Sequence, residues 1–186
     1  MPAYEDIKKL AGIISALREP WDHHGDHVAS YAVILAQTLG LPKAEVDLIA
    51  VGANLHDIGK ILIREELVNL PRKYDAEERE QMEQHTINGW EIVHQAGYDE
   101  MIQQIVRSHH ERWDGRGYPD RLQGDEIPIG AQIVAIADQY SAWTSKRLYR
   151  DAMSHHFTQA YIQKDKGTRF NPELVDRFFD KVKFRL

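Results

Sequence analysis

Apolar residues recur at every third or fourth position through most of this 186-residue chain, which is the period of an amphipathic helix. Between residues 24 and 39, for example, Val28, Ala32, Leu35 and Leu39 fall on one face. No segment shows the alternation of apolar and polar residues that is typical of a half-buried strand. The pattern therefore predicts an all-α fold.

Capping and helix-breaking residues set the limits of the predicted helices. They are expected at 4–18, 24–39, 77–95, 99–109 and 130–145, with one more that opens at Pro42 and runs into "AVGANLHDIGK", and two others capped by Ser154 and Asn171. The segment "ERWDGRGYPDRLQGDEIP" (111–128) is rich in glycine and proline, so it is predicted to be a loop.

Length and composition are those of one soluble globular unit. We expect an N-terminal helix within residues 1–21 and a main domain at 22–186. The net charge of −6 argues against binding to a nucleic-acid polymer, which needs a basic surface. No apolar run approaches the roughly 18 residues of a membrane span, and the first residues lack a signal-peptide core. The chain is therefore expected to be cytoplasmic and not bound to a membrane.

Histidines and carboxylates inside apolar segments are the candidate metal ligands. Asp57 in "NLHDIGKIL" and Asp138 in "VAIADQYSA" would be costly to bury without a partner of opposite charge. The chain has no cysteine, so any metal must be held by nitrogen and oxygen. The full candidate set is His24, His56, Asp57, His85, His109, His110 and Asp138. This set is larger than one tetrahedral zinc ion requires, and it suits two octahedral ions that share a carboxylate.

Each position also has a simpler interpretation when it is taken alone. His24 is compatible with an ordinary surface residue, His85 with a hydrogen-bonded semi-buried histidine, and the pair at 109–110 with a solvated helix end. Lys60 is compatible with a surface lysine, and Tyr118 with a tyrosine that packs on a structural turn. Only the combination of motifs distinguishes these interpretations from a metal site.

Five segments occur in the order and spacing of the HD-GYP family, a branch of the HD-domain metal-dependent phosphohydrolases. They are "HDIGK" (56–60), "HTINGW" (85–90), "HHERWDGRGYP" (109–119), "IADQYSAWTSKRLYR" (136–150) and "GTRFNPELVDRF" (167–178). The resemblance implies a single-domain HD-type helical bundle with a Gly/Pro-rich GYP loop. It also implies a phosphodiesterase that hydrolyses cyclic di-GMP, or a related cyclic dinucleotide, with a hydroxide activated by two metal ions.

The same resemblance implies a role for individual residues. One ion would be held by His24, His56, Asp57 and Asp138, and the other by Asp57, His85, His109 and His110. Iron or manganese is the expected metal, with zinc and nickel as alternatives. Asp57 and Lys60 are the expected catalytic residues, and the expected substrate contacts are Lys60, Tyr118, Ser141, Arg147 and Arg150. The GYP loop is a candidate contact for diguanylate cyclases or other signalling proteins.

Several positions depart from the family pattern. Ser141 stands where the family has a carboxylate suited to a guanine edge, and Leu148 replaces a proline. Pro20 stands where some relatives have a glutamate that binds a third ion. These departures keep other functions open: a metal-retaining module that binds a nucleotide or protein with little turnover, another HD-type nucleotide phosphohydrolase, and a di-iron oxygenase.

Overall fold

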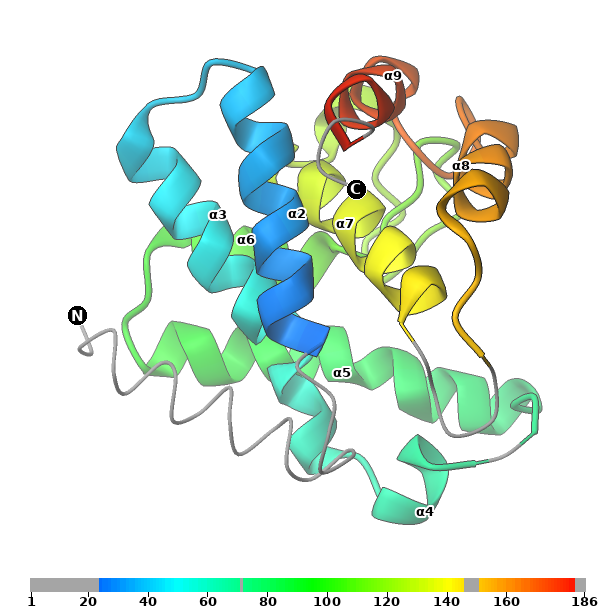
Figure 1. Cartoon of the computed structure of the whole chain (residues 1–186). Coiled ribbons are helices and arrows are strands. Elements are labelled where there is room, and N and C mark those ends of the chain that lie inside the picture. The colour runs from blue at the N-terminus through cyan, green and yellow to red at the C-terminus, as the bar shows by residue number, and fades with distance from the viewer. Residues whose placement is uncertain (1–23, 71, 146–150, 183–186) are drawn as a thin grey trace.

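A computed structural model describes residues 24–70, 72–145 and 151–182. Its helices are α2 (His24–Thr38), α3 (Lys43–Leu55), η1 (Ile58–Leu62), α4 (Glu65–Val68), α5 (Ala76–Gln95), α6 (Glu100–Ser108), η2 (Gly124–Glu126), α7 (Ile129–Thr144), α8 (His155–Lys164) and α9 (Pro172–Val182) (Figure 1). Within the described residues there are only two isolated β-bridges and no strand. The predicted all-α fold is confirmed, and the helix predicted at 4–18 lies outside the described residues.

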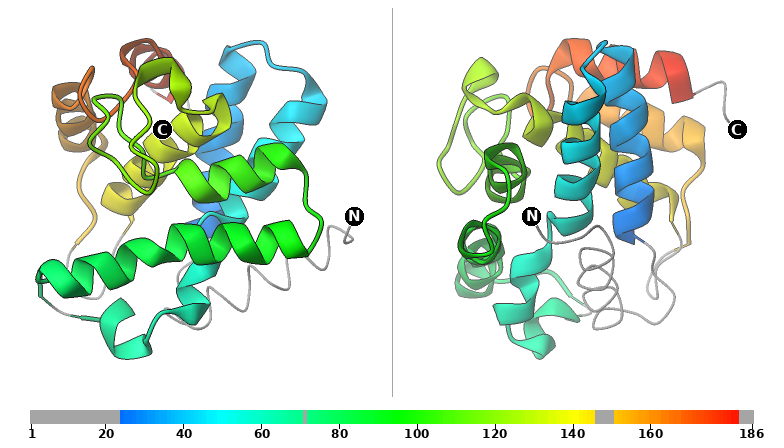
Figure 2. Two further views of the ribbon diagram at one scale, coloured as in Figure 1. Left: turned by 180° about the vertical axis from the view of Figure 1, so that it is seen from behind. Right: turned by 90° about the vertical axis from the view of Figure 1, so that its left-hand side faces the viewer.

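The helices form two groups that meet near the middle of the molecule. Helices α2 and α3 pair as a hairpin, and α2 also packs against α7 and α9. Helices α5 and α6 form a second hairpin, which crosses the end of the first and packs against η1 and α3 (Figures 1 and 2). None of the helices in the described part of the chain is long and apolar enough to cross a bilayer.

Two clusters of buried apolar residues hold the helices of these two groups together. The larger joins α2, α3, α7 and α9 and includes the fully buried Leu35, Ile49, Ile136 and Phe178. The smaller joins the end of α3 to α5 and α6 through Leu55, Ile58, Val93, Tyr98, Ile102 and Val106. Helix α3 contributes to both clusters, so the residues at its C-terminal end lie where the two groups of helices meet.

The end of α3 differs from the prediction. The pattern extended this helix into "HDIGK", but it ends at Leu55 and the chain re-forms as the 3₁₀ helix η1 from Ile58. Gly59 in η1 approaches α5 so closely that a Cβ atom there would lie 1.9 Å from the carbonyl oxygen of His85. The two short helices η1 and α4 were not predicted, because segments of four or five residues carry too little periodicity to be recognised.

The predicted helix caps agree with the structure. Ser154 accepts a hydrogen bond from the backbone amide of Phe157 at the start of α8. Asn171 accepts one from the amide of Glu173, and its side-chain amide donates to Gln132 of α7 at 2.8 Å. Asn171 therefore both caps α9 and ties it to the core helix.

Replacing Asn171 by alanine is expected to lower the free energy of unfolding by about 1–2 kcal/mol, because the cap and the bond to the buried Gln132 are lost together. Chemical denaturation of the two proteins measures the difference. Asn69→Ala is the control, since Asn69 is exposed, and it should change the stability by less than about 0.5 kcal/mol. Equal effects of the two substitutions would contradict the role of Asn171.

Candidate metal centre

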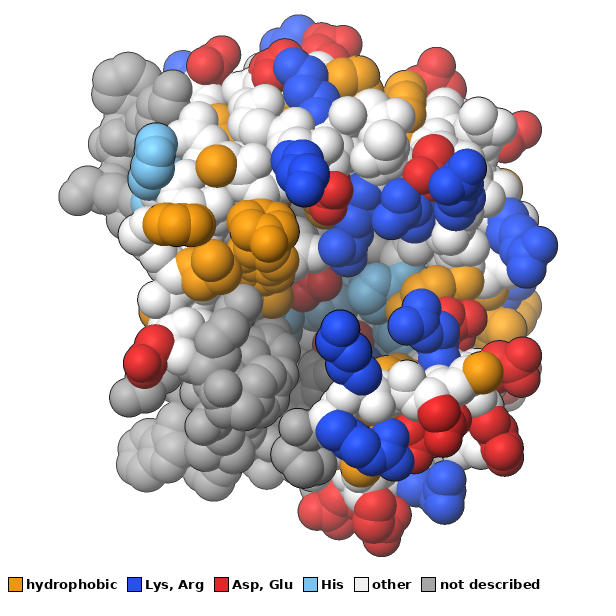
Figure 3. Space-filling model, turned by 90° about the vertical axis from the view of Figure 1, so that its right-hand side faces the viewer, with side chains coloured by type: hydrophobic (Ala, Val, Ile, Leu, Met, Phe, Trp, Pro, Cys, Tyr) orange, Lys and Arg blue, Asp and Glu red, His pale blue; other side chains and the backbone are white. Residues whose placement is uncertain are grey.

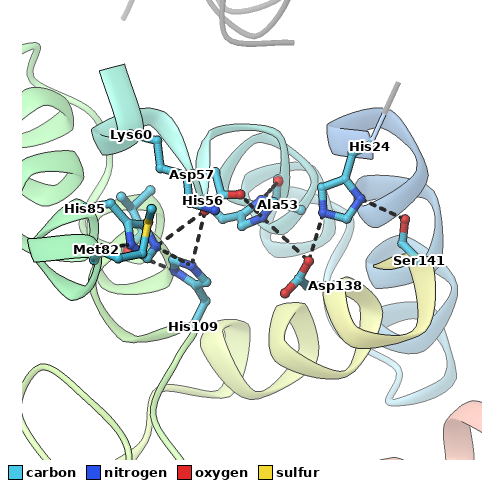
Figure 4. A network of polar contacts seen from close by, with 11 residues as sticks. His24, Ala53, His56, Asp57, Lys60, Met82, His85, His109, Asp138 and Ser141 are labelled. Atoms are coloured by element: carbon cyan, nitrogen blue, oxygen red, sulfur yellow. Dashed lines mark hydrogen bonds and ion pairs between the residues drawn. The ribbon is translucent and has the colours of Figure 1, made fainter. Parts of the chain in front are cut away.

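Five helices bring the predicted ligands to one point (Figure 4). The side chains come from the first turn of α2, the end of α3, the middle of α5, the end of α6 and the middle of α7. In that order they are His24, His56 with Asp57, His85, His109 with His110, and Asp138. All are buried or half-buried, and only 6% of Asp57 is exposed. The structure thus brings together all seven residues that were predicted from the sequence.

The ligand atoms fall into two sets that overlap at Asp57. In one, single atoms of Asp57, His85, His109 and His110 lie within 4.8 Å of one another. In the other, the same holds for His24, His56 and Asp57. Asp138 adjoins this second set, because its Oδ1 lies 2.9 Å from Nε2 of His24 and 3.8 Å from Nε2 of His56. The division matches the one that the family resemblance implies.

The backbone fixes which nitrogen of three histidines faces the centre. The Nδ1 atoms of His56, His85 and His109 lie 2.6, 2.7 and 3.0 Å from carbonyl oxygens three residues earlier in the chain. A carbonyl only accepts, so Nδ1 carries the hydrogen and, in the neutral ring, Nε2 presents a lone pair. This is the usual way in which proteins orient histidine ligands toward a metal.

These Nε2 atoms point at a carboxylate. Those of His85 and His109 are 3.4 and 4.0 Å from Oδ1 of Asp57, and that of His56 is 3.3 Å from its Oδ2. The Nε2 atoms of His85 and His109 are also only 3.4 Å apart. The Nε2 lone pairs and the carboxylate oxygens of Asp57 would repel one another at these distances unless a cation lay between them. The donor set therefore fits divalent cations, and the absence of sulfur is compatible with any of the metals predicted.

The protonation states agree with this fit. Burial lowers the pKa of His85 and of His110 well below 6.5, and it lowers that of His109 to about 4, so these rings are neutral near pH 7. Burial also acts to lower the pKa of His56, but the carboxylates of Asp57 and Asp138 outweigh it and raise the pKa above 6.5. A proton and a metal ion therefore compete for Nε2 of His56.

Lys60 lies beside the shared carboxylate. Its Nζ is 2.7 Å from Oδ1 of Asp57, one turn back along the chain, and the side chain is half-buried. This contact distinguishes it from a lysine on an open surface. Its charge also helps to keep the pKa of His85 low, after the larger effect of burial. Lys60 thus adds a positive group at the edge of the centre.

The GYP loop closes another side of the centre. The ring of Tyr118 lies 4.8 Å from the ring of His110, measured between centroids. The buried Glu111 holds the loop, because its Oε1 accepts the backbone N–H of Asp120 at 2.7 Å. Gly117 is required there, since a Cβ atom would lie 2.4 Å from the backbone nitrogen of Arg112.

A cavity of about 500 Å³ separates this loop from α5. It is lined by Glu83, Gln84 and Ile87 of α5 and by Gly115, Arg116, Gly117, Tyr118, Pro119 and Arg121 of the loop. Tyr118 belongs both to this cavity and to the edge of the metal centre. Figure 3 shows the histidines at the base of a hollow on the surface, with lysine and arginine side chains around it.

Ser141 is placed differently from the prediction. It was expected to contact a guanine, but it is fully buried and its Oγ lies 3.1 Å from Nδ1 of His24 (Figure 4). The opposite nitrogen of that ring faces Asp138. Ser141 therefore stands behind a candidate ligand and away from the surface. Arg147 and Arg150, the other two predicted contacts from this region, lie outside the described residues.

Two residues at the site were missed in the sequence. Glu111 was quoted only as part of a motif, although a carboxylate just before a Gly-rich loop is a common acceptor for loop amides. Arg169 lies within the segment "GTRFNPELVDRF" and was given no role of its own. Its backbone carbonyl accepts the N–H of Trp113, which brings the segment before α9 against the start of the GYP loop. The sequence offers only a weak indication of this contact: Arg169 directly precedes the apolar Phe170.

Known proteins resemble this chain over most of its length. A family model of the HD domain matches residues 8–174. The chain is 37% identical over 174 residues to "3'3'-cGAMP-specific phosphodiesterase 2" of Vibrio cholerae, covering 92% of this chain and 33% of that protein. It is 37% identical over 153 residues to "Cyclic di-GMP phosphodiesterase response regulator RpfG" of Xanthomonas campestris, covering 81% of this chain and 40% of the relative. The chain thus spans less than half the length of these two curated relatives.

A solved structure shows the same fold. The crystal structure of a cyclic GMP-AMP-specific phosphodiesterase from V. cholerae, V-cGAP3, superposes with a TM-score of 0.74 at 16% identity, over 95% of this chain and 48% of that one. Fold, motifs and family match agree, and the resemblance inferred from the motifs is confirmed. The chain belongs to the HD-domain family, and its motifs resemble those of the HD-GYP branch.

Proposed function

We propose that this chain hydrolyses a cyclic dinucleotide, either cyclic di-GMP or 3'3'-cGAMP, at a centre of two divalent metal ions. The observation that carries the proposal is the position of Asp57, whose carboxylate is shared by two buried sets of ligand atoms beside an open cavity. The names of the two curated relatives support the substrate class. The reaction adds water across one P–O ester bond and opens the ring to a linear dinucleotide.

In this proposal, His24, His56, Asp57 and Asp138 hold one ion, and Asp57, His85, His109 and His110 hold the other. Iron or manganese is the proposed metal, because imidazole and carboxylate ligands suit both. When bound, two such ions supply a nucleophile at neutral pH and neutralise negative charge on the phosphate. Asp57 would be a ligand of both ions, because it belongs to both ligand sets.

Lys60 is the residue that is proposed to contact the reacting phosphate. Its ammonium group lies 2.7 Å from Oδ1 of Asp57, so it places a cation at the edge of the proposed centre that can pair with an anionic phosphate oxygen. Tyr118 is proposed to contact the nucleotide where the cavity meets the centre. A contact between the GYP loop and a diguanylate cyclase stays a prediction.

A second candidate function is nucleotide binding with little turnover. It is favoured by Ser141, since a neutral hydroxyl supports His24 less strongly than the carboxylate of the family pattern would. A centre with only one tightly held ion would retain binding but lose much of the catalysis. Nucleotide binding without formation of a linear product would distinguish this candidate from the hydrolase. Assays with other nucleotide substrates would test the remaining HD-type phosphohydrolases.

Protein purified without oxygen and loaded with Mn²⁺ or Fe²⁺ is expected to convert cyclic di-GMP or 3'3'-cGAMP to the linear dinucleotide. Asp57→Asn and His85→Ala should give no product above the metal-free control, because each removes a ligand from the shared centre. Chromatography of the reaction mixture measures the product, and elemental analysis measures the bound metal.

His94→Ala is the matched control, since His94 lies on the same helix as His85 but is exposed and outside both ligand sets. It should keep the activity and the metal content of the original protein. Full activity of Asp57→Asn would contradict the proposed centre. Binding of the nucleotide without any product would favour the second candidate function.

Replacing Ser141 by alanine is expected to weaken one of two metal-binding steps about 10-fold, because His24 loses the partner that orients its ring. Calorimetric titration of metal-free protein with Mn²⁺ measures both steps. The step that involves His85 and His109 should not change, since backbone carbonyls hold those rings.

The control for this titration is Ser30→Ala, which removes an exposed hydroxyl on the same helix as His24 and should leave both steps unchanged. An equal loss in both steps would indicate a general change in the fold. No loss in either step would show that Ser141 does not orient His24.

A further inference from the structure

Within the part of the chain that the structure describes, the guanidinium group of Arg169 forms no ion pair with a carboxylate. The side chain is half-buried, yet among the described residues it makes no hydrogen bond and no ion pair. Its one observed contact is the ring of Phe170, 5.2 Å from Cζ to the ring centroid. An arginine carries five N–H donors, and placing them away from water without acceptors is unfavourable. Burial accordingly lowers the pKa of Arg169.

Three arginines of the described residues near this segment do have carboxylate partners. Arg107 pairs with both carboxylate oxygens of Asp120, and Arg112 pairs in the same way with Asp114. On α9, Arg177 pairs with Glu173 one turn away. Arg169 differs from these three because it is half-buried with its guanidinium donors available to a ligand.

The backbone of Arg169 is held firmly. Its carbonyl accepts the N–H of Trp113 at 3.2 Å, and the carbonyl of Thr168 accepts the N–H of Asp114 at 2.8 Å. The N–H of Arg169 donates to Asp165 at 2.9 Å, and the next residue, Phe170, is anchored in the larger apolar cluster. A bound anion would thus meet a guanidinium on a fixed support.

Arg169 also lies near the proposed centre. Its charge interacts with the carboxylate of Asp138, which is a candidate ligand, and with the hydroxyl of Tyr118 in the GYP loop. It also interacts with the carboxylate of Asp165 and, more weakly, with the charge of Arg112. The hydrogen bond from the N–H of Trp113 to its carbonyl places Arg169 where the segment before α9 meets the start of the GYP loop.

We propose that Arg169 binds a phosphate of the cyclic dinucleotide. This inference rests on the proposed function and adds a substrate contact to it. A cyclic dinucleotide has two phosphates, and the metal ions with Lys60 can neutralise only the one that reacts. The second phosphate then needs another cation. A guanidinium fork fits a phosphate with two parallel hydrogen bonds.

The test compares Arg169→Gln with Arg169→Lys in steady-state hydrolysis of cyclic di-GMP. The glutamine variant should raise KM about 10- to 100-fold, which is the loss expected for one charge-assisted pair, and change kcat less than about threefold. The Arg169→Lys variant keeps the positive charge but loses the two parallel N–H donors. Its KM should therefore lie between that of the original protein and that of Arg169→Gln. Arg177→Gln is the matched control, since Arg177 is exposed on α9, and it should behave as the original protein.

A second arm identifies the group that Arg169 contacts. Cyclic di-GMP, 3'3'-cGAMP and cyclic di-AMP have the same two phosphates but different bases. A phosphate contact predicts the same fold-loss in the affinity of Arg169→Gln for all three, measured by equilibrium binding. A loss confined to the guanine-containing ligands would overturn the phosphate assignment, because the same fork also fits O6 and N7 of guanine.

Failure of this inference can be told apart from failure of the proposed function. If the original protein binds but does not hydrolyse the nucleotides, the binding ratios still decide the role of Arg169. Unchanged affinity in Arg169→Gln, with normal metal content and thermal stability, would overturn the inference alone. Absence of both binding and turnover in the original protein would overturn the inference and the proposed function together.

Discussion

The buried carboxylate of Asp57 is the constraint on which the rest of this site depends. It is 6% exposed and is faced by imidazole nitrogens that backbone carbonyls have turned toward it. A negative charge in that position is stable only beside positive charge. Lys60 supplies one such charge at 2.7 Å, and the geometry of the surrounding nitrogens suits further cations. The proposals for metal binding and for hydrolysis both follow from this one group.

The fold holds that carboxylate by interrupting a helix. Helix α3 ends at Leu55, and the turn that follows directs His56 and Asp57 into the junction between the two helical hairpins. Gly59 lets η1 lie directly against α5, where a Cβ atom would meet the carbonyl of His85. The apolar residues on either side, Leu55 and Ile58, are fully or almost fully buried and lock the turn. Apolar packing therefore provides the rigidity, while the polar residues at the junction provide the chemistry.

The sequence predicted features that depend on local pattern or on ordered motifs. Helix periodicity located α2 and α5 to within a residue or two, and the spacing of the HD-GYP motifs identified the seven residues that meet at the centre. Contacts between positions far apart in the sequence could not be predicted. Ser141 meets His24 across 117 residues of sequence, and the position of Arg169 depends on how the segment before α9 packs against the GYP loop. Neither contact leaves a periodic signal.

The two proposed ion sites differ in how their histidines are supported. His85 and His109 are oriented by carbonyl groups of their own helices, which no side-chain substitution removes. His24 is oriented by a hydrogen bond between its Nδ1 and the side-chain hydroxyl of Ser141. Ser141 is fully buried behind the ring, so its replacement would alter the ligand without altering the surface that meets the substrate. The orientation of His24 therefore depends on one side chain, whereas the orientations of His56, His85 and His109 depend on backbone carbonyls.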